Sequence, residues 1–282
     1  MVDQPDIRDW IGRTREDEDR LDPHRAATLT ALTSTERFDA DIGRTAPPLA
    51  HWACFPEIAL QSALGEDGHP RRGGFLPPVT LPRRMWAAGS IEWHRPPAIG
   101  AMLRRRSTVA DVTVKRGRSG DLVFVRVEHE IRDEAGPLIG ETQEIVYRDA
   151  PVPGAAHVPP KPAPPADWSD EVLPDPVLLF RYSALTANTH RIHYDRPFAT
   201  DVEGYPGLVV HGPLIATLLL HHLLARHPGA NPVRFAFRAV RPLFDGAPFR
   251  LCGSAPSPDG SIALHAADAD GALCMDAVAT LS

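Results

Sequence analysis

The 282-residue sequence contains two lysines and three cysteines, and it has no uninterrupted apolar segment long enough to span a membrane. The cysteines are odd in number, widely spaced and without a C-x-x-C motif, so we expect neither a disulfide framework nor a zinc site. The most apolar run, residues 208–225, is broken by one proline and three histidines. The N-terminus also lacks the basic and apolar pattern of a signal peptide. These absences predict a cytoplasmic protein that does not enter a membrane.

Charged residues are unevenly placed along the sequence. The formal net charge of -6 argues against a dedicated nucleic-acid-binding protein, which would present a basic face. Residues 71–118 nevertheless contain eleven lysines and arginines against only Glu92 and Asp111. This cluster is consistent with a site for a small anion. It is equally consistent with a solvated surface in a protein whose arginine, alanine, proline and glycine excess is typical of GC-rich coding.

The chain reads as two similar halves joined by a proline-rich segment. Residues 151–176 contain too much proline for a helix or a central strand, so we expect an extended linker between domains at residues 1–150 and 177–282. On each side an R-P-x-x-x-G motif, Arg95–Gly100 and Arg241–Gly246, lies among alternating apolar segments that predict strands and hairpins. This arrangement favours an internal duplication.

One helix is strongly indicated in the second half. Gly212 and Pro213 mark its start, and residues 227–229 mark its end. Its leucines leave little polar face, so the helix should be mostly buried. The weaker candidate in the first half is residues 47–64. The predicted fold class is therefore α+β, with a long helix wrapped by antiparallel sheet in each half.

Two stretches resemble a known family. "RYSALTANTHRIHYD" (residues 181–195), followed by "EGYPGLVVHGPL" (residues 203–214), resembles the hydratase motif of MaoC-like enoyl-thioester hydratases. "DGHPRRGGFLPPVTLPRRMWAAGSIEWHRP" (residues 67–96) is similar to the N-terminal domain of their double hot dog members. Those members include mesaconyl- and itaconyl-CoA hydratases and type-two hydroxyacyl-thioester dehydratases. The resemblance implies a tandem hot dog with a non-catalytic first half and a catalytic second half.

The resemblance also implies the catalytic residues. His193 would be the base, since imidazole titrates nearest neutrality, and the helix start at Gly212 would stabilise negative charge on the thioester oxygen. Many relatives carry an aspartate five residues before the histidine, whereas this sequence has Asn188. An amide cannot carry the proton. We therefore expect His193 both to remove the water proton and to return one to carbon, while Asn188 holds the water.

Other residues are candidates for binding the substrate. Coenzyme A enters as part of that substrate, and no separate cofactor is expected. Arginines suit its phosphates, and aromatic side chains suit an acyl pocket. The candidates are Arg83, Arg84, Trp86, Arg191, Tyr205, His211 and Arg241. His190 and His193 have an H-x-x-H spacing, but the sequence offers no clear third and fourth ligands, so we predict no metal.

The predicted activity is reversible addition of water to an α,β-unsaturated acyl-CoA, with a short branched or dicarboxylic acyl group such as mesaconyl or itaconyl. Two alternatives stay open: a 3-hydroxyacyl dehydratase acting on acyl carrier protein, and a non-catalytic module that binds acyl thioesters. Thioesterases of this fold usually carry an acidic residue on the central helix, and residues 214–226 contain none. Pairing into a homodimer is also left open.

Overall fold

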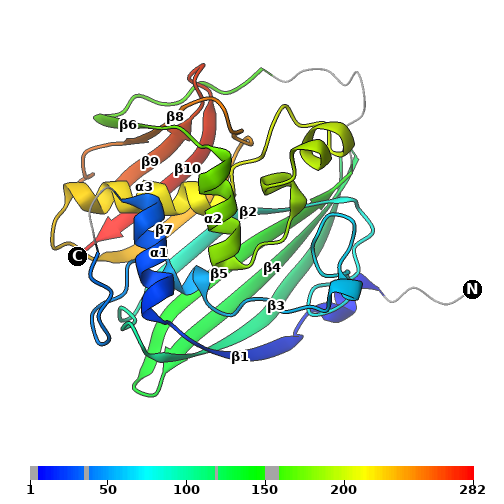
Figure 1. The fold of residues 1–282 in the computed structure, drawn as a ribbon, viewed down its shortest axis with the longest axis horizontal. Coiled ribbons are helices and arrows are strands. Elements are labelled where there is room, and N and C mark those ends of the chain that lie inside the picture. Colours follow the sequence, from blue (N-terminus) through cyan, green and yellow to red (C-terminus); the bar gives the residue numbers. More distant parts are fainter. Residues whose placement is uncertain (1–5, 35–37, 118–119, 150–158) are drawn as a thin grey trace, which may run out of the picture.

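Ten strands form one continuous antiparallel sheet in the computed structural model, which describes residues 6–34, 38–117, 120–149 and 159–282. The strand order is β1-β3-β4-β5-β2-β7-β10-β9-β8-β6. Three helices lie together against one face of this sheet (Figure 1). The first five strands of the order come from the first half of the chain and the last five from the second.

The elements have the following bounds. The helices are α1 (Pro23–Thr33), α2 (Pro176–Thr186) and α3 (Gly212–Arg226). Short helical turns occur at Ile7–Trp10, Ala50–Ala53, Gln61–Ala63, Arg191–His193 and Phe198–Val202. The strands are β1 (Thr14–Arg20), β2 (Arg83–Trp93), β3 (Met102–Gly117), β4 (Gly120–Asp133), β5 (Gly136–Arg148), β6 (Trp168–Val172), β7 (Pro232–Ala239), β8 (Phe249–Gly253), β9 (Ser261–Ala267) and β10 (Leu273–Leu281).

The repeated R-P-x-x-x-G motif occupies equivalent places in the two half-sheets. It follows β2 in the first half and β7 in the second, and the two strands pair antiparallel at the centre of the sheet. The Arg95 N–H donates to the carbonyl of Leu138, and the Arg241 N–H donates to that of Cys274. Both motif glycines have positive φ, +89° and +82°, a conformation that favours glycine. The predicted tandem antiparallel architecture is confirmed.

The predicted helix of the second half is also confirmed. It starts at Gly212 and ends at Arg226, next to the His227, Pro228 and Gly229 that marked its end in the sequence. Eight of its residues are buried: Leu214, Ile215, Ala216, Thr217, Leu218, Leu219, Leu220 and Leu223. The helix therefore fills the concave side of β7–β10 (Figure 1). Within the described residues, no helix is long and apolar enough to cross a membrane.

The helix predicted over residues 47–64 is wrong. This segment contains only two short 3-10 turns, Ala50–Ala53 and Gln61–Ala63. Prolines at 47, 48 and 56 remove backbone donors, and Leu49 and Phe55 both have positive φ, which breaks helical geometry. The first half therefore has no described counterpart of α3, and space remains on its side of the sheet.

A helix that the sequence reading missed, α1, is instead the counterpart of α2. Each has eleven residues, begins with a proline and is capped by the aspartate before it, Asp22 or Asp175. An Asp-Pro pair is a recognised helix start, because the carboxylate accepts from free N–H groups and proline needs no partner. The two helices contact each other across the halves.

The expected linker is partly built into the sheet. Residues 151–158 lie outside the described residues. Beyond them, Trp168–Val172 form β6, which pairs with β8 at the edge of the second half. The extended conformation is correct there, but the second half begins before residue 177. An edge position explains this, because an edge strand needs hydrogen-bond partners on one side only.

Part of the arginine cluster has a structural role. The acidic strand β1 pairs with β3, which places Glu16, Asp17 and Glu18 opposite Arg106, Arg105 and Arg104. Two of these rows form ion pairs, Arg104 with Glu18 at 2.7 Å and Arg105 with Asp17 at 2.8 Å. These arginines balance the charge of β1.

Acid should weaken the junction of α3 with the first half. The His221 ring nitrogens contact Thr33 Oγ1 at 2.6 Å and the Pro48 carbonyl at 2.9 Å, and burial lowers the pKa of His221 to about 4. The unfolded chain binds this proton at higher pH than the folded one, so stability is lost as pH falls from about 6.5 toward 4. We expect about 2 kcal/mol from this residue after allowance for its residual exposure.

The measurement is urea unfolding at pH 7 and pH 4.5. His221→Gln, whose amide can still donate to Pro48, should lose a clear part of the pH dependence, whereas His24→Gln on the exposed face of α1 should not. An equal loss of stability with pH in wild type and His221→Gln would contradict the assignment.

Candidate active site

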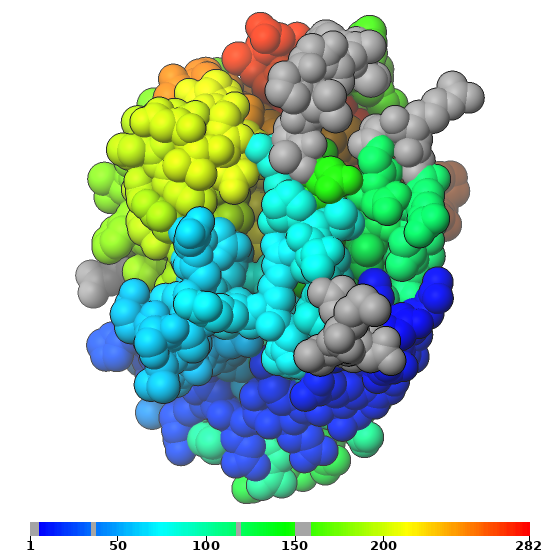
Figure 2. Space-filling model, turned by 90° about the vertical axis from the view of Figure 1, so that its right-hand side faces the viewer, coloured from blue at the N-terminus to red at the C-terminus, as the bar shows by residue number. Residues whose placement is uncertain are grey.

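A cavity of about 520 Å³ lies where the two halves meet. Its walls come from β2 and the segment before it in the first half, and from the α2–α3 region in the second half. Figure 2 shows these parts side by side at the surface, with sky-blue and cyan residues next to yellow-green and yellow ones. Asn188, His193 and Gly212, the three predicted catalytic residues, all line this cavity.

The His193 ring is held in place by a hydrogen bond from its Nδ1 to the backbone. The residue ends the short turn Arg191–His193, only 7% of its surface is exposed, and its Nδ1 contacts the Val209 carbonyl at 2.7 Å. A carbonyl can only accept, so Nδ1 carries the hydrogen and Nε2 is left with a lone pair. Burial, only partly opposed by this hydrogen bond, lowers the pKa of His193 to about 4. The ring is therefore a neutral imidazole at physiological pH.

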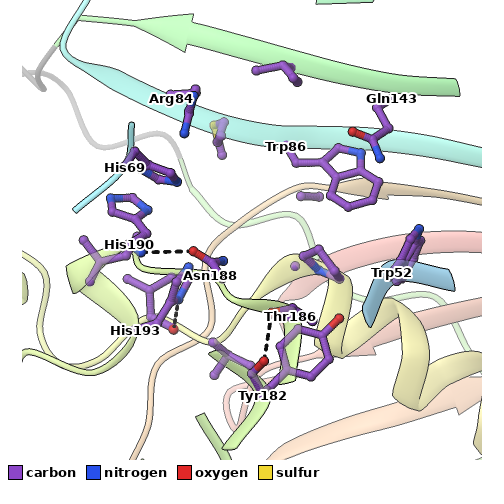
Figure 3. Close-up of a pocket in the computed structure, with 18 of the residues that line it drawn as sticks. Trp52, His69, Arg84, Trp86, Gln143, Tyr182, Thr186, Asn188, His190 and His193 are labelled. Carbon is purple, nitrogen blue, oxygen red and sulfur yellow. Dashed lines mark hydrogen bonds between the residues drawn. The ribbon is translucent and has the colours of Figure 1, made fainter. Parts of the chain in front are cut away.

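Asn188 lies just after α2, where Ala187 with positive φ ends the helix. Its Oδ1 accepts a hydrogen bond from the His190 backbone N–H at 3.0 Å, which fixes the amide. The opposite end of the amide, which carries Nδ2, points into the cavity (Figure 3). The side chain can therefore donate hydrogen bonds to a molecule bound beside His193.

Gly212 is the first residue of α3. Intrahelical bonding starts with the Ile215 N–H, which donates to the His211 carbonyl, so the Gly212 N–H has no partner inside the helix. Pro213 has no N–H to offer. A Cβ built on Gly212 would meet only the Trp86 carbonyl oxygen, at 3.9 Å. The fold therefore does not require glycine here, and its absent side chain leaves room for a ligand to approach the helix N-terminus.

A second group of polar side chains lies next to His193. His190 contacts His193 edge to face with ring centres 5.5 Å apart, and the ring of His69 from the first half lies 4.3 Å from that of His190. Burial and then the neighbouring imidazoles lower the pKa of His190 to about 2. Asp67 accepts from the His69 backbone at 3.0 Å, and its carboxylate lies 3.3 Å from His69 Nδ1.

Asp67, His69 and His190 are close enough to be considered as metal ligands, since one atom from each lies within 4.8 Å of the others. Three observations weigh against a cation there. Asp67 is already bonded to His69, the charge of Arg84 acts on both imidazoles, and the described residues offer no fourth His, Cys, Asp or Glu ligand in this group. The absence of a metal stays a prediction.

Five of the predicted binding residues line the cavity: Arg83, Arg84, Trp86, Tyr205 and Arg241. Two of these arginines are committed to the fold, because Arg83 pairs with Glu203 at 3.3 Å and Arg241 pairs with Asp268 at 3.4 Å. Tyr205 lies under the Arg83 guanidinium at 5.0 Å. The contact of these residues with substrate stays a prediction.

The other two predicted binding residues serve different roles. Arg191 is not a wall of the cavity: it pairs with Asp195 at 2.7 Å and donates to the Glu66 carbonyl at 3.0 Å, so it joins the halves. His211 is 1% exposed, stacks on His193 with ring centres 3.7 Å apart, and lies 2.8 Å from Ser183 Oγ through Nε2. It lies behind His193 and is not a wall of the cavity, so the structure does not place it where it was expected to meet a substrate.

The sequence reading missed a buried network in the first half. Glu141 contacts His51 at 3.1 Å, accepts from the Trp52 indole at 2.9 Å and accepts from Gln143 at 2.9 Å. Burial raises the pKa of Glu141, but these partners outweigh it and lower the pKa to about 2. The carboxylate thereby fixes Trp52, which packs edge to face on Trp86 at 5.1 Å. No local motif marks residues that pair across 90 positions.

Comparison with known proteins agrees with this geometry. The family model of hydroxyacyl-thioester dehydratase type 2 matches residues 49–245. The mesaconyl-C(4)-CoA hydratase of Chloroflexus aurantiacus is 48% identical over 268 residues, which cover 91% of this chain and 95% of that protein.

Two solved structures share the fold. A MaoC-like dehydratase from Phytophthora capsici superposes with a TM-score of 0.73 at 16% identity, covering 99% of this chain and 98% of the other. A Mycobacterium tuberculosis protein with a double hot dog fold gives a TM-score of 0.61 at 15% identity, covering 96% of each chain. The protein is thus a double hot dog that belongs to the hydroxyacyl-thioester dehydratase type 2 family.

Proposed function

We propose that this protein is an enoyl-CoA hydratase, which adds water reversibly to the double bond of an α,β-unsaturated acyl-CoA. The observation that carries the proposal is the arrangement around His193. One cavity is lined by three groups: the neutral imidazole of His193 with its Nε2 lone pair, the fixed amide of Asn188, and the N-terminus of α3 at Gly212. These groups supply a base, a water holder and a site for negative charge.

The first step forms the carbon–oxygen bond. His193 Nε2 takes a proton from a water held by the Asn188 amide, and the water oxygen adds to the β-carbon. The electron pair of the double bond moves onto the thioester carbonyl, whose oxygen becomes negative. The Gly212 N–H and the positive end of α3 stabilise that oxygen.

The second step returns the proton. The electron pair moves back from the oxygen to the α-carbon, which takes the proton from His193 Nε2. The imidazole is then neutral again, and the net change is addition of one water. Dehydration runs through the same groups in reverse, which accounts for the dehydratase named by the family. The use of coenzyme A as the carrier and a cytoplasmic location stay predictions, while the direction in the cell and pairing into a homodimer are left open.

We infer a short dicarboxylic acyl group of the mesaconyl type. The support is the 48% identity to the Chloroflexus hydratase over nearly the whole chain and the cavity lined by Trp52, Trp86 and Tyr182. The itaconyl group stays an expectation from the sequence.

His193→Ala should lower kcat by about a hundredfold to ten-thousandfold, because it removes the only proton carrier of the mechanism. His190→Ala and His69→Ala should cost much less, and a chelator should change nothing. The measurement is the loss of enoyl-thioester absorbance with mesaconyl-C4-CoA. An inactive His69→Ala that keeps its fold and affinity would show that the first half takes part in the chemistry.

Asn188→Asp should move the acid limb of the pH–rate profile upward. In wild type that limb should lie near the His193 pKa of about 4, since only the neutral imidazole is a base. A carboxylate nearby favours the imidazolium and raises its pKa. The profile of kcat/KM from pH 4 to 9 tests this, and an acid limb that does not move would mean that the two side chains do not interact.

Gly212→Ala should separate activity from stability. Alanine favours a helix over glycine by about 0.5–1 kcal/mol, and the fold has room for its Cβ, so the melting temperature should hold or rise. The added methyl group should keep the thioester oxygen from the helix N-terminus, so kcat should fall by about tenfold or more. Unchanged kcat would place the oxygen elsewhere.

A further inference from the structure

The charged residues that line the cavity are almost all paired. The four acidic ones each have a basic partner in contact: Glu57 with Arg15, Asp67 with His69, Glu141 with His51 and Glu203 with Arg83. Of the five lining arginines, three have a carboxylate within 4 Å: Arg83, Arg105 and Arg241. Within the described part of the chain, Arg84 and Arg148 are the two that have none.

These two arginines occupy different positions. Arg148 is the last residue of β5 and is exposed, so it lies toward solvent. Arg84 is half-buried on β2, two residues before Trp86, and both side chains therefore point to the same face of the strand. Figure 3 shows Arg84 on the side of the cavity where His69 and His190 lie.

Although the charge of Glu57 reaches His69 and Tyr147 as well, no carboxylate in the described residues lies within 4 Å of Arg84. The Arg84 charge acts on His69, His190 and the Tyr147 hydroxyl, which are neutral at physiological pH. Asp67 is the acidic group nearest in sequence to this cluster, and it is bonded to the backbone and ring of His69. A half-buried cation without an anionic partner is costly unless a ligand supplies that partner.

We propose that Arg84 binds the free carboxylate of a dicarboxylic acyl group, and that this contact selects the substrate. The inference rests on the proposed hydratase function and specifies its substrate class. Mesaconyl-C4-CoA is crotonyl-CoA with a carboxylate on the β-carbon, the carbon that receives the water. The carboxylate is thus one bond from the reacting carbon. Its binding group must lie near His193, and Arg84 is the described cavity arginine that has no ion pair and whose charge acts on His190, the ring in contact with His193.

The test compares substrates that differ only in this charge. Wild type, Arg84→Gln and Arg84→Lys are assayed with mesaconyl-C4-CoA, with 3-methylcrotonyl-CoA, in which a methyl group replaces the carboxylate, and with crotonyl-CoA. The control is Arg126→Gln, which removes an exposed sheet arginine that pairs with Glu144 at 2.7 Å and does not line the cavity.

Arg84→Gln should lower kcat/KM for mesaconyl-C4-CoA by roughly tenfold to a hundredfold, the effect of losing a charge-assisted hydrogen bond. It should change kcat/KM for the two uncharged substrates by less than about threefold, and Arg84→Lys should recover part of the loss. Where an uncharged substrate turns over too slowly, the affinities for methylsuccinyl-C4-CoA and isovaleryl-CoA, the saturated analogues of the first pair, should show the same selectivity.

Equal losses on all three substrates would overturn the proposal and would place Arg84 on the coenzyme A part or in the fold. Wild-type preference for crotonyl-CoA over mesaconyl-C4-CoA would also overturn it, while the hydratase function would stand. Failure of the wild type with every enoyl-CoA would instead contradict the proposed function itself. A thermal melt of each variant excludes loss of folding as the cause.

Discussion

The pairing of β2 with β7 is the interaction on which the rest of the molecule depends. It joins two half-sheets into one continuous sheet. Its geometry is tight: a Cβ on Gly89 would lie 2.7 Å from the Phe237 ring, so a side chain at position 89 would displace that ring. Phe237 in turn contacts Trp52 and Trp86. The seam between the halves therefore also fixes the aromatic wall of the cavity.

Burial determines the chemistry available in that cavity. It keeps His69, His190, His193 and His211 neutral by lowering the pKa of each. A base with a pKa of about 4 is weak, but its conjugate acid is correspondingly strong. In the proposed mechanism, the cost of removing a proton from water is thus partly recovered when His193 returns one to the α-carbon. A single residue that both removes and returns the proton must have a pKa that suits the two steps together. A second titrating side chain at position 188 would allow each step its own group.

Local patterns in the sequence predicted much of the fold, and long-range pairing accounts for most of what was missed. Alternation, turn residues and the start and end of α3 are encoded within short windows, and they were read correctly. The helix prediction for residues 47–64 was wrong because it rested on apolar content, although the prolines of this segment exclude a helix. Arg191 and His211 misled in a different way. Both lie beside predicted catalytic residues in sequence, but whether a side chain faces the cavity depends on partners such as Glu66 and Ser183.

The two halves are unequal, and this difference leaves room for one cavity beside His193. In the second half, α3 fills its side of the sheet and presents Gly212 at its N-terminus. In the first half no described helix occupies the equivalent space, and the walls come from turns that carry Trp52, His69 and Glu57. The turn around Gly68 packs closely against the loop that contains Thr189. A Cβ on Gly68 would clash with the Thr189 carbonyl. The lack of a described helix at this place leaves room for the cavity, while backbone contacts of this kind keep the two halves in register around His193.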